Sequence, residues 1–325
     1  MNQETLTKYN IAAKICSKAY NEIITNLYND IHNVYDLCRI GNRVIIEECN
    51  KIYKKESNKG IAYPTSISLN NCIGNFVYEP KSSYNTIKVN DVVKIELGVN
   101  IGGCIATLGK TVNYNNEPDS EIVTFLESLE KKIVKELKSG NLNDDVRILV
   151  ESECADKGYF LIENCTSYQQ LNGHPKTEES KYIVFNHQKY YDDEDNLVVE
   201  TNDCFDFEEN EVYTINIVIG KDLGSNVKYI EPHSSHIARM NEYFYNLKLK
   251  SSREFYSKVK FSHGNNAFYL DNYNQEYTSR IGIKECSDIG ILDMYPVQYI
   301  KGNMPLYHKK FTVVVGKDKG ISLKY

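Results

Sequence analysis

The sequence predicts an α+β fold made of two similar halves. Segments with helical periodicity are followed by β-branched segments, and this order occurs twice along the 325-residue chain. Hydrophobic residues make up 41% of the chain, which is enough for one large core or two closely joined lobes. No internal repeat is exact enough to prove the symmetry, so we infer it from the order of elements alone.

The first half is expected to contain two helices and two strands. Apolar residues from Ile11 to Leu27 recur every four positions, which is typical of one face of an amphipathic helix. A Gly102-Gly103 turn separates two short β-branched segments. The expected elements are helices at about 8–28 and 37–52 and strands at 91–98 and 104–112.

The second half repeats this order and contains an insertion. Glycines 140 and 158 are expected to end two helices that start near Ser120 and Asn143. Strands are expected at 182–185, 212–220 and 310–316. The polar and aromatic stretch 232–275, with helical pieces such as Ile237–Leu249, is predicted to be an inserted subdomain. The chain is then a single domain, 1–325, that carries this small helical insert.

Charge and cysteine content limit the class of protein. The net charge of −6 argues against a nucleic-acid partner, but the acids are concentrated. Ten acids and one lysine between Lys189 and Glu211 give −9, which leaves +3 for the remainder. Nine scattered cysteines without a CxxC pair predict reduced thiols, and thus a cytoplasmic or nuclear protein. No apolar run approaches the ~20 residues of a membrane span, and no secretory signal is evident, so no membrane partner is expected.

No familiar catalytic motif is present. The sequence contains no GxSxG, no P-loop and no HExxH. The cysteines also lack a flanking histidine pattern that would favour one of them as a nucleophile. Any activity must therefore be sought in a resemblance that extends over several segments.

Three segments together resemble the type 2 methionine aminopeptidases. They are Gly60–Cys72 (GIAYPTSISLNNC), Lys94–Gly98 (KIELG), and Ile283–Cys286 with Leu292–Pro296 (IKEC and LDMYP). The likeness covers nearly the whole chain and implies the pita-bread fold, with two pseudo-symmetric halves around a central sheet. The run Pro64–Ser68 and Lys310 are most similar to the proliferation-associated, ErbB-receptor-binding branch. Its members are non-catalytic and bind RNA and ribosomes.

The resemblance also implies where the aminopeptidase chemistry should lie. The enzymes hold two adjacent divalent cations with two Asp, one His and two Glu, and a separate His contacts the substrate. The corresponding positions here, with the substrate histidine first, are Asn75, Glu96, Thr107, His174, Asn216 and Lys310. Only Glu96 and His174 remain as ligands, so no metal, no cofactor and no catalytic residue is predicted. Lys310 is expected to occupy the former metal position and to pair with Glu96.

Structural roles for the two retained residues must be weighed as well. His174 is expected to be an interior histidine with satisfied hydrogen bonds rather than a ligand. Glu96 is expected to be a salt-bridge partner rather than a base.

The predicted insert supplies a candidate binding surface. Six bases outnumber two acids between His236 and Phe261, and aromatic residues alternate with them. Basic side chains contact phosphates and aromatic faces stack on unpaired bases. The bases are Arg239, Lys248, Lys250, Arg253, Lys258 and Lys260. A solvated basic helix face with core aromatics is the alternative interpretation. Lys51, Lys54, Lys55 and Lys59 form a second, smaller cluster.

The resulting hypothesis is a non-enzymatic protein that binds ribosomes, at the large subunit, or structured RNA. It would act in translation or growth control, in the cytoplasm and also in the nucleus or nucleolus. One alternative is an aminopeptidase-like metallohydrolase with an unusual metal site. Another is a pseudoenzyme that still recognises N-terminal methionine in the old pocket, and protein partners remain a further option.

Overall fold

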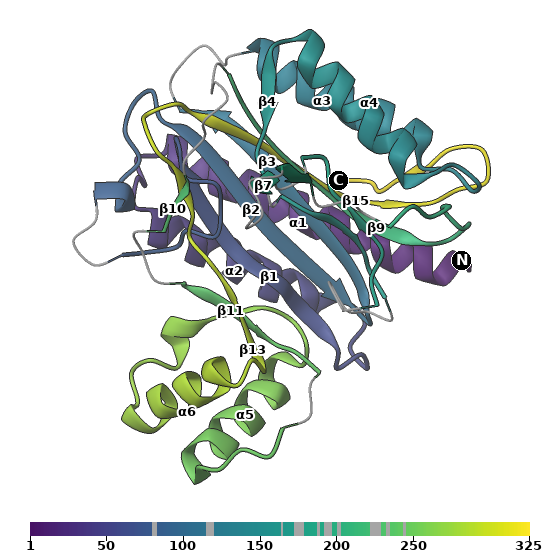
Figure 1. Cartoon of the computed structure of the whole chain (residues 1–325). Helices are drawn as coiled ribbons and strands as arrows, with labels where there is room; N and C mark the ends of the chain where they lie inside the picture. The colour runs from purple at the N-terminus through teal and green to yellow at the C-terminus, as the bar shows by residue number, and fades with distance from the viewer. Residues whose placement is uncertain are drawn as a thin grey trace.

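The computed structural model contains a large antiparallel sheet with helices on one face and a smaller subdomain beyond one end (Figure 1). The structure describes residues 1–79, 83–114, 120–163, 165–171, 179–186, 189–191, 197–199, 203–221, 229–231, 235–242 and 245–325. The helices are α1 (Gln3–Tyr28), α2 (Val34–Lys51), α3 (Ser120–Glu136), α4 (Asn143–Asp156), α5 (Lys250–His263) and α6 (Tyr277–Asp288). Short 3₁₀ turns lie at Ser83–Asn85 and Leu270–Asn272.

The described strands form one nine-stranded sheet and three small ones. The central order is β1 (Lys59–Leu69), β2 (Val92–Ile101), β3 (Cys104–Asn113), β15 (Leu306–Val314), β9 (Val212–Lys221), β5 (Ser167–Gln169) and β6 (Tyr182–Ile183). At its margins β16 (Ile321–Ser322) pairs with β15, and β4 (Tyr159–Leu161) pairs with β9. The small sheets join β7 (Lys189–Tyr191) to β8 (Leu197–Val199), β10 (Tyr229–Ile230) to β14 (Tyr299–Ile300), and β11 (Ile237–Met240) to β12 (Phe268–Tyr269) and β13 (Leu292–Tyr295).

The first helix begins earlier than its apolar pattern predicts. The side chain of Asn2 accepts a hydrogen bond from the backbone N–H of Thr5 at 2.7 Å and caps the helix, whose first residue, Gln3, lies five positions before the expected start. Its predicted apolar face is buried against the sheet, with Ile23 and Leu27 fully covered. None of the helices in the described ranges combines the length and apolar character that crossing a bilayer requires.

Alternation along the strands gives the large sheet two chemically different faces. On β2, Val93, Ile95 and Leu97 belong to the core beneath α1 and α2. On β15, Phe311 and Val313 belong to a second core beneath α3 and α4. Because successive side chains point to opposite faces, the residues between them face away from the helices. A polar row therefore lies on the uncovered face.

The insert has its own sheet and core, and one prediction within it is wrong. Residues 237–240 form strand β11, not a helix, because β12 and β13 pair with this strand along both edges. Helix α5 begins at Lys250 instead. The core of this subdomain includes Phe255 and continues past Gln275 to Leu292 through α6 and β13. Figure 1 shows the subdomain at the far side of the sheet from α3 and α4.

Candidate functional site

A cross-strand row of five residues marks the centre of the uncovered face. Each member lies opposite the next in the ladder, so the side chains of the four members other than the glycine share one face. In order from β1 to β9 the row is Ser66, Glu96, Gly109, Lys310 and Asn216. Two sequence-predicted positions on different strands, Glu96 and Lys310, are thus separated only by a glycine.

Lys310 makes the predicted contact with Glu96. The lysine Nζ lies 2.5 Å from Glu96 Oε1, and both side chains are about 10% exposed, at 11% and 9%. Burial alone would raise the pKa of Glu96, but the nearby ammonium outweighs it and lowers the pKa. Burial alone would likewise lower the pKa of Lys310, and the carboxylate raises it. Both directions describe a buried pair that stays charged.

Gly109 leaves the space through which the lysine reaches its partner. A Cβ atom at this position would lie 2.6 Å from the Lys310 Cβ and 2.8 Å from Cε1 of His308. No such contact is sterically allowed without movement of the strand. A glycine on the middle strand is therefore required for this ion pair.

The row opens into a cavity of about 860 Å³. Its lining includes five of the six positions that the resemblance assigned to aminopeptidase chemistry: Asn75, Glu96, Thr107, Asn216 and Lys310. The sixth, His174, lies outside the described residues. The sequence therefore identified positions that the fold brings to one site.

Asn75 is held in place at the cavity wall. Its backbone has φ of 64°, a left-handed conformation that asparagine tolerates better than most residues. Its side-chain oxygen accepts a hydrogen bond from the Tyr63 hydroxyl at 2.5 Å, and its amide donates to the carbonyl of Pro296 at 2.8 Å. Both ends of the amide are thus occupied by neighbouring elements, one of them at the end of the insert.

Thr107 is bonded to the sheet. Its hydroxyl lies 3.1 Å from that of Thr312, and its backbone N–H donates to the same oxygen at 3.0 Å. The Tyr325 hydroxyl donates to the Thr107 carbonyl at 2.6 Å and accepts from the Thr312 N–H at 2.8 Å. This position has a neutral, structural role in the observed geometry.

His308 is a site residue that the sequence reasoning missed. Its Nε2 lies 2.7 Å from Asn216 Oδ1, and the residue is 4% exposed. Burial lowers the pKa of His308 to about 4, so the ring is neutral at pH 7. Alternation could have found it, because His308 and Lys310 are two residues apart on one strand and share a face.

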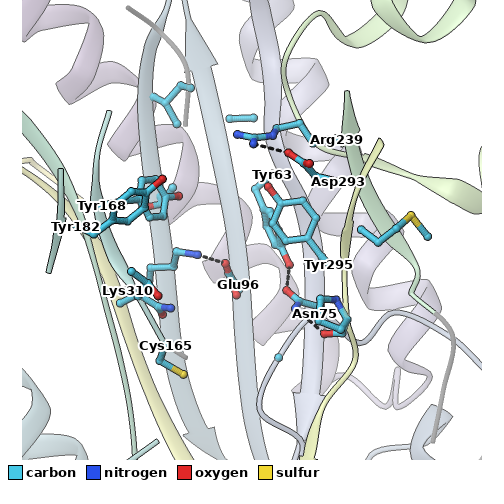
Figure 2. Close-up of a pocket in the computed structure, with 18 of the residues that line it drawn as sticks. Tyr63, Asn75, Glu96, Cys165, Tyr168, Tyr182, Arg239, Asp293, Tyr295 and Lys310 are labelled. Atoms are coloured by element: carbon cyan, nitrogen blue, oxygen red, sulfur yellow. Dashed lines mark hydrogen bonds and ion pairs between the residues drawn. The ribbon is translucent and has the colours of Figure 1, made fainter. Parts of the chain in front are cut away.

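Aromatic side chains form the remaining walls (Figure 2). The Lys310 ammonium lies 5.4 Å from the centre of the Tyr63 ring, and Tyr63 meets Tyr295 edge to face at 5.6 Å. Figure 2 shows Tyr168 and Tyr182 on the opposite side of the Lys310–Glu96 pair. Tyrosine side chains therefore lie on both sides of the ion pair.

Arg239 belongs to this cavity and not to an exposed basic surface. It is 8% exposed, and its Nη2 lies 2.7 Å from Asp293 Oδ2 on β13 (Figure 2). Strand β11 turns the side chain inward, so the expectation of a surface contact fails for this residue. The physical reason is the same strand pairing that replaces the expected helix.

The side chains around Glu96 do not fit two adjacent divalent cations. Thr107 and Asn216 are neutral, and Lys310 supplies a positive charge where a metal would need a carboxylate. Among the residues that the structure describes, no group of three or more His, Cys, Asp or Glu is arranged to hold a metal ion. The observed arrangement supports an internal salt bridge and a ligand cavity.

The other five basic candidates lie on the insert and differ in their exposure and in the groups that they contact. Lys248 is exposed, while Lys250 and Lys258 are exposed but within 3.6 and 3.5 Å of Glu254 and Glu276. Arg253 donates to the carbonyls of Leu247 and Lys248, and Lys260 bonds to Asn265. Lysines 248, 250 and 258 are thus the members available to a partner.

Exposed aromatic residues accompany them, and one of the aromatics expected between the bases, Tyr245, is among them at 45% exposed. Phe255 is core, at 2% exposed, whereas Phe261 is 94% exposed and Tyr277 is 70% exposed. Phe261 lies one helical turn beyond Lys258, whose ion pair with Glu276 brings the start of α6 beside it. Tyr243 and Phe244 lie outside the described residues. In the second cluster, Lys51 pairs with Glu48 and Lys59 donates to backbone carbonyls.

Comparisons with known proteins agree with this architecture. Residues 7–231 match the model of Metallopeptidase family M24. The chain is 28% identical to ErbB-3 binding protein 1 of Solanum tuberosum over 97% of this chain and 81% of that protein. It is 27% identical to the curved DNA-binding protein of Schizosaccharomyces pombe over 91% and 77%. The structure of a thermophilic Arx1 matches with a TM-score of 0.79 at 21% identity, over 99% of this chain and 91% of that one. The predicted resemblance and the predicted pita-bread fold are confirmed.

Proposed function

Although the chain belongs to metallopeptidase family M24, we propose that it performs no peptidase chemistry and that it binds ribosomes or structured RNA. The observation that carries the first part is the contact between Lys310 and Glu96. A divalent cation bound by Glu96 would lie within a few ångströms of the ammonium. At an effective dielectric near 20, that repulsion costs several kcal/mol. A lysine at this position therefore opposes metal binding at the one retained carboxylate.

The binding role is supported by the surface of the insert. Lys248, Lys250 and Lys258 are exposed there, and the exposed rings of Phe261 and Tyr277 lie toward the Lys258 end of α5. Lysines neutralise phosphates, and exposed aromatic rings stack on unpaired bases. A similar protein is described as a curved DNA-binding protein, which supports a nucleic-acid partner for this fold. The large ribosomal subunit is the proposed particle, with a role in translation or growth control in the cytoplasm and nucleus.

The chemical part of the proposal is tested with purified protein. After dialysis against cobalt or manganese, the protein should retain less than one equivalent of metal. It should also release no methionine from a Met-Ala-Ser peptide. Retention of two equivalents together with turnover that a chelator abolishes would establish the alternative, an aminopeptidase with an unusual metal site.

The binding part is tested by sedimentation through sucrose gradients. Changing Lys248, Lys250 and Lys258 to Glu should remove the protein from the ribosomal fraction at moderate salt, since phosphate contacts are strongly salt-dependent. The matched control changes the exposed Lys14, Lys88 and Lys301 to Glu, which alters net charge equally. Equal co-sedimentation of the two variants would rule out the insert as the contact surface.

A further inference from the structure

A second cleft lies on the helix-covered side of the sheet and carries the opposite charge to the first cavity. It has a volume of about 830 Å³ and lies between α3, β15 and the turn before β16. Six lysines and three acids line it, a net charge of +3 in a protein of net charge −6. The lysines are Lys110, Lys131, Lys135, Lys309, Lys317 and Lys319. The cavity around Glu96, in contrast, has five acids and two bases in its described lining, a net charge of −3.

The floor of the cleft is fixed by buried charge. Lys309 is 8% exposed, and its Nζ lies 2.5 Å from Glu130 Oε2 on α3. Lys110 lies beside it, with its ammonium 5.4 Å from the centre of the Tyr20 ring. Burial lowers the pKa of Lys110, and the positive charge of Lys309 lowers it further. Glu130 pairs with Lys309, and Glu130 and Glu127 both favour the charged form of Lys110, so the excess positive charge of the cleft lies on its rim.

The rim is held by a tight turn. The Gly320 N–H donates to the Val134 carbonyl at 2.7 Å, which fastens the turn to α3. A Cβ at Gly316 would lie 2.1 Å from the Lys319 carbonyl oxygen, so only glycine permits this closure. Lys317 and Lys319 are exposed on the turn, and Lys131 and Lys135 are exposed on α3. Within the described part of the chain, these four form no ion pair.

We propose that this cleft binds a phosphate-dense anion through its lysines, without recognition of a base. Lysine ammonium groups act as point charges that suit phosphate oxygens. Among the described lining residues there is neither an arginine for planar bidentate recognition nor an aromatic ring on which a base could stack. The ligand chemistry is therefore closely spaced phosphates, either in a soluble polyphosphate or along an RNA backbone. This proposal does not depend on the role of the insert.

The test uses full-length protein with two probes, inorganic tripolyphosphate and a blunt 20-base-pair RNA duplex. The cleft variant changes Lys131, Lys135, Lys317 and Lys319 to Gln. Its control changes Lys14, Lys88, Lys157 and Lys301 to Gln, four exposed lysines outside the cleft and the two basic clusters, with the same loss of charge. Circular dichroism and urea midpoints confirm that both variants fold. The insert variant, with Lys248, Lys250 and Lys258 changed to Glu, separates this site from the insert.

We expect the cleft variant, but not the control, to bind at least one probe about tenfold more weakly. The slope of log K against log salt should become shallower by up to about 4 for the affected probe. Weakening for tripolyphosphate alone identifies a soluble polyphosphate as the ligand, and weakening for the duplex identifies an RNA backbone. The insert variant should retain the cleft-dependent binding. Equal affinities of the cleft variant and its control for both probes would overturn the proposal.

Discussion

The ammonium of Lys310 lies 2.5 Å from the carboxylate of Glu96, although strand β3 separates the strands that carry them. The contact is possible because Gly109 occupies the intervening position and adds no side chain. Three residues on three strands therefore form one structural unit at the centre of the cavity. Its energetic and chemical consequences can be tested separately.

The ion pair should appear as strong coupling in a double-mutant cycle. Lys310→Met leaves Glu96 buried without its partner, which should cost about 3–5 kcal/mol of unfolding free energy. Adding Glu96→Leu removes the isolated charge, so the double variant should be more stable than Lys310→Met alone. Urea unfolding at pH 7 gives the three differences. Strictly additive losses would contradict the pairing.

Gly109 should tolerate no side chain. Gly109→Ala places a Cβ within 3.1 Å of the Lys310 backbone nitrogen, besides its contacts with the lysine and histidine side chains. We expect a loss of about 1–3 kcal/mol in urea unfolding. Gly74→Ala is the matched control, because that glycine also lines the cavity but a Cβ atom there would have nothing within 4 Å. Similar losses at the two positions would show that crowding at Gly109 is unimportant.

Protonation of His308 should destabilise the folded protein as the pH falls below the ordinary pKa of histidine. The folded-state pKa is lowered to about 4, so the unfolded chain binds the proton more readily than the folded one. The stabilising contribution is full above pH ~6.5 and is lost as the pH falls toward 4, by about 3 kcal/mol in total. His308→Gln cannot titrate in this window. Its stability should fall less steeply between pH 6.5 and 4 than that of the parent protein.

The stability contributed by Glu96 changes over a lower pH range than that contributed by His308, so the two contributions can be measured separately. The pKa of Glu96 is lowered in the folded state from the ordinary value of 4.5. The stability that it contributes is therefore present above pH 4.5 and is lost as the pH falls through the folded value. The difference in slope between the parent and His308→Gln above pH 4.5 then reports the histidine. Parallel curves in that range would refute the assignment.

Substitution of Arg239 should lower the unfolding free energy without changing partner binding. The arginine side chain is buried against Asp293, so Arg239→Gln should reduce the unfolding free energy by about 1–3 kcal/mol. Ribosome co-sedimentation of the folded variant should remain unchanged. Lys258→Gln is the opposite case, with little effect on stability but weaker co-sedimentation. A sedimentation loss with Arg239→Gln equal to that with Lys258→Gln would place the contact surface near the cavity.

Much of the fold could be predicted because the large sheet and its helices follow simple periodicities. The helices near α1 and α3 and the strands near β2, β3 and β9 match their apolar patterns within a few residues. The site positions Asn75, Glu96 and Lys310 could also be placed, because the resemblance connected segments that are distant in sequence. Periodicity alone carries no information on which strands become neighbours.

The failures come from tertiary context. The segment 237–240 became a strand because two other strands pair with it, and its own sequence does not specify those partners. Phe255 and Phe261 are both aromatic residues on α5, yet one is buried and the other exposed. Only the packing of α6 against this helix decides between a core residue and a contact residue. The lysine cleft was missed for the same reason, since its residues come from separate elements.

Because two adjacent lysines on β15 contact opposite faces of the sheet, the folded structure should depend more on the number of residues in that strand than on the identity of most of them. Lys309 meets Glu130 on the helix-covered side, and Lys310 meets Glu96 in the cavity. The two lysines are chemically identical, but deletion of either would leave one of these carboxylates without a lysine. It would also turn one end of the strand over, so that residues now in the core would face the cavity. We therefore expect most point substitutions in β15 to be milder than the loss of one residue from this lysine pair.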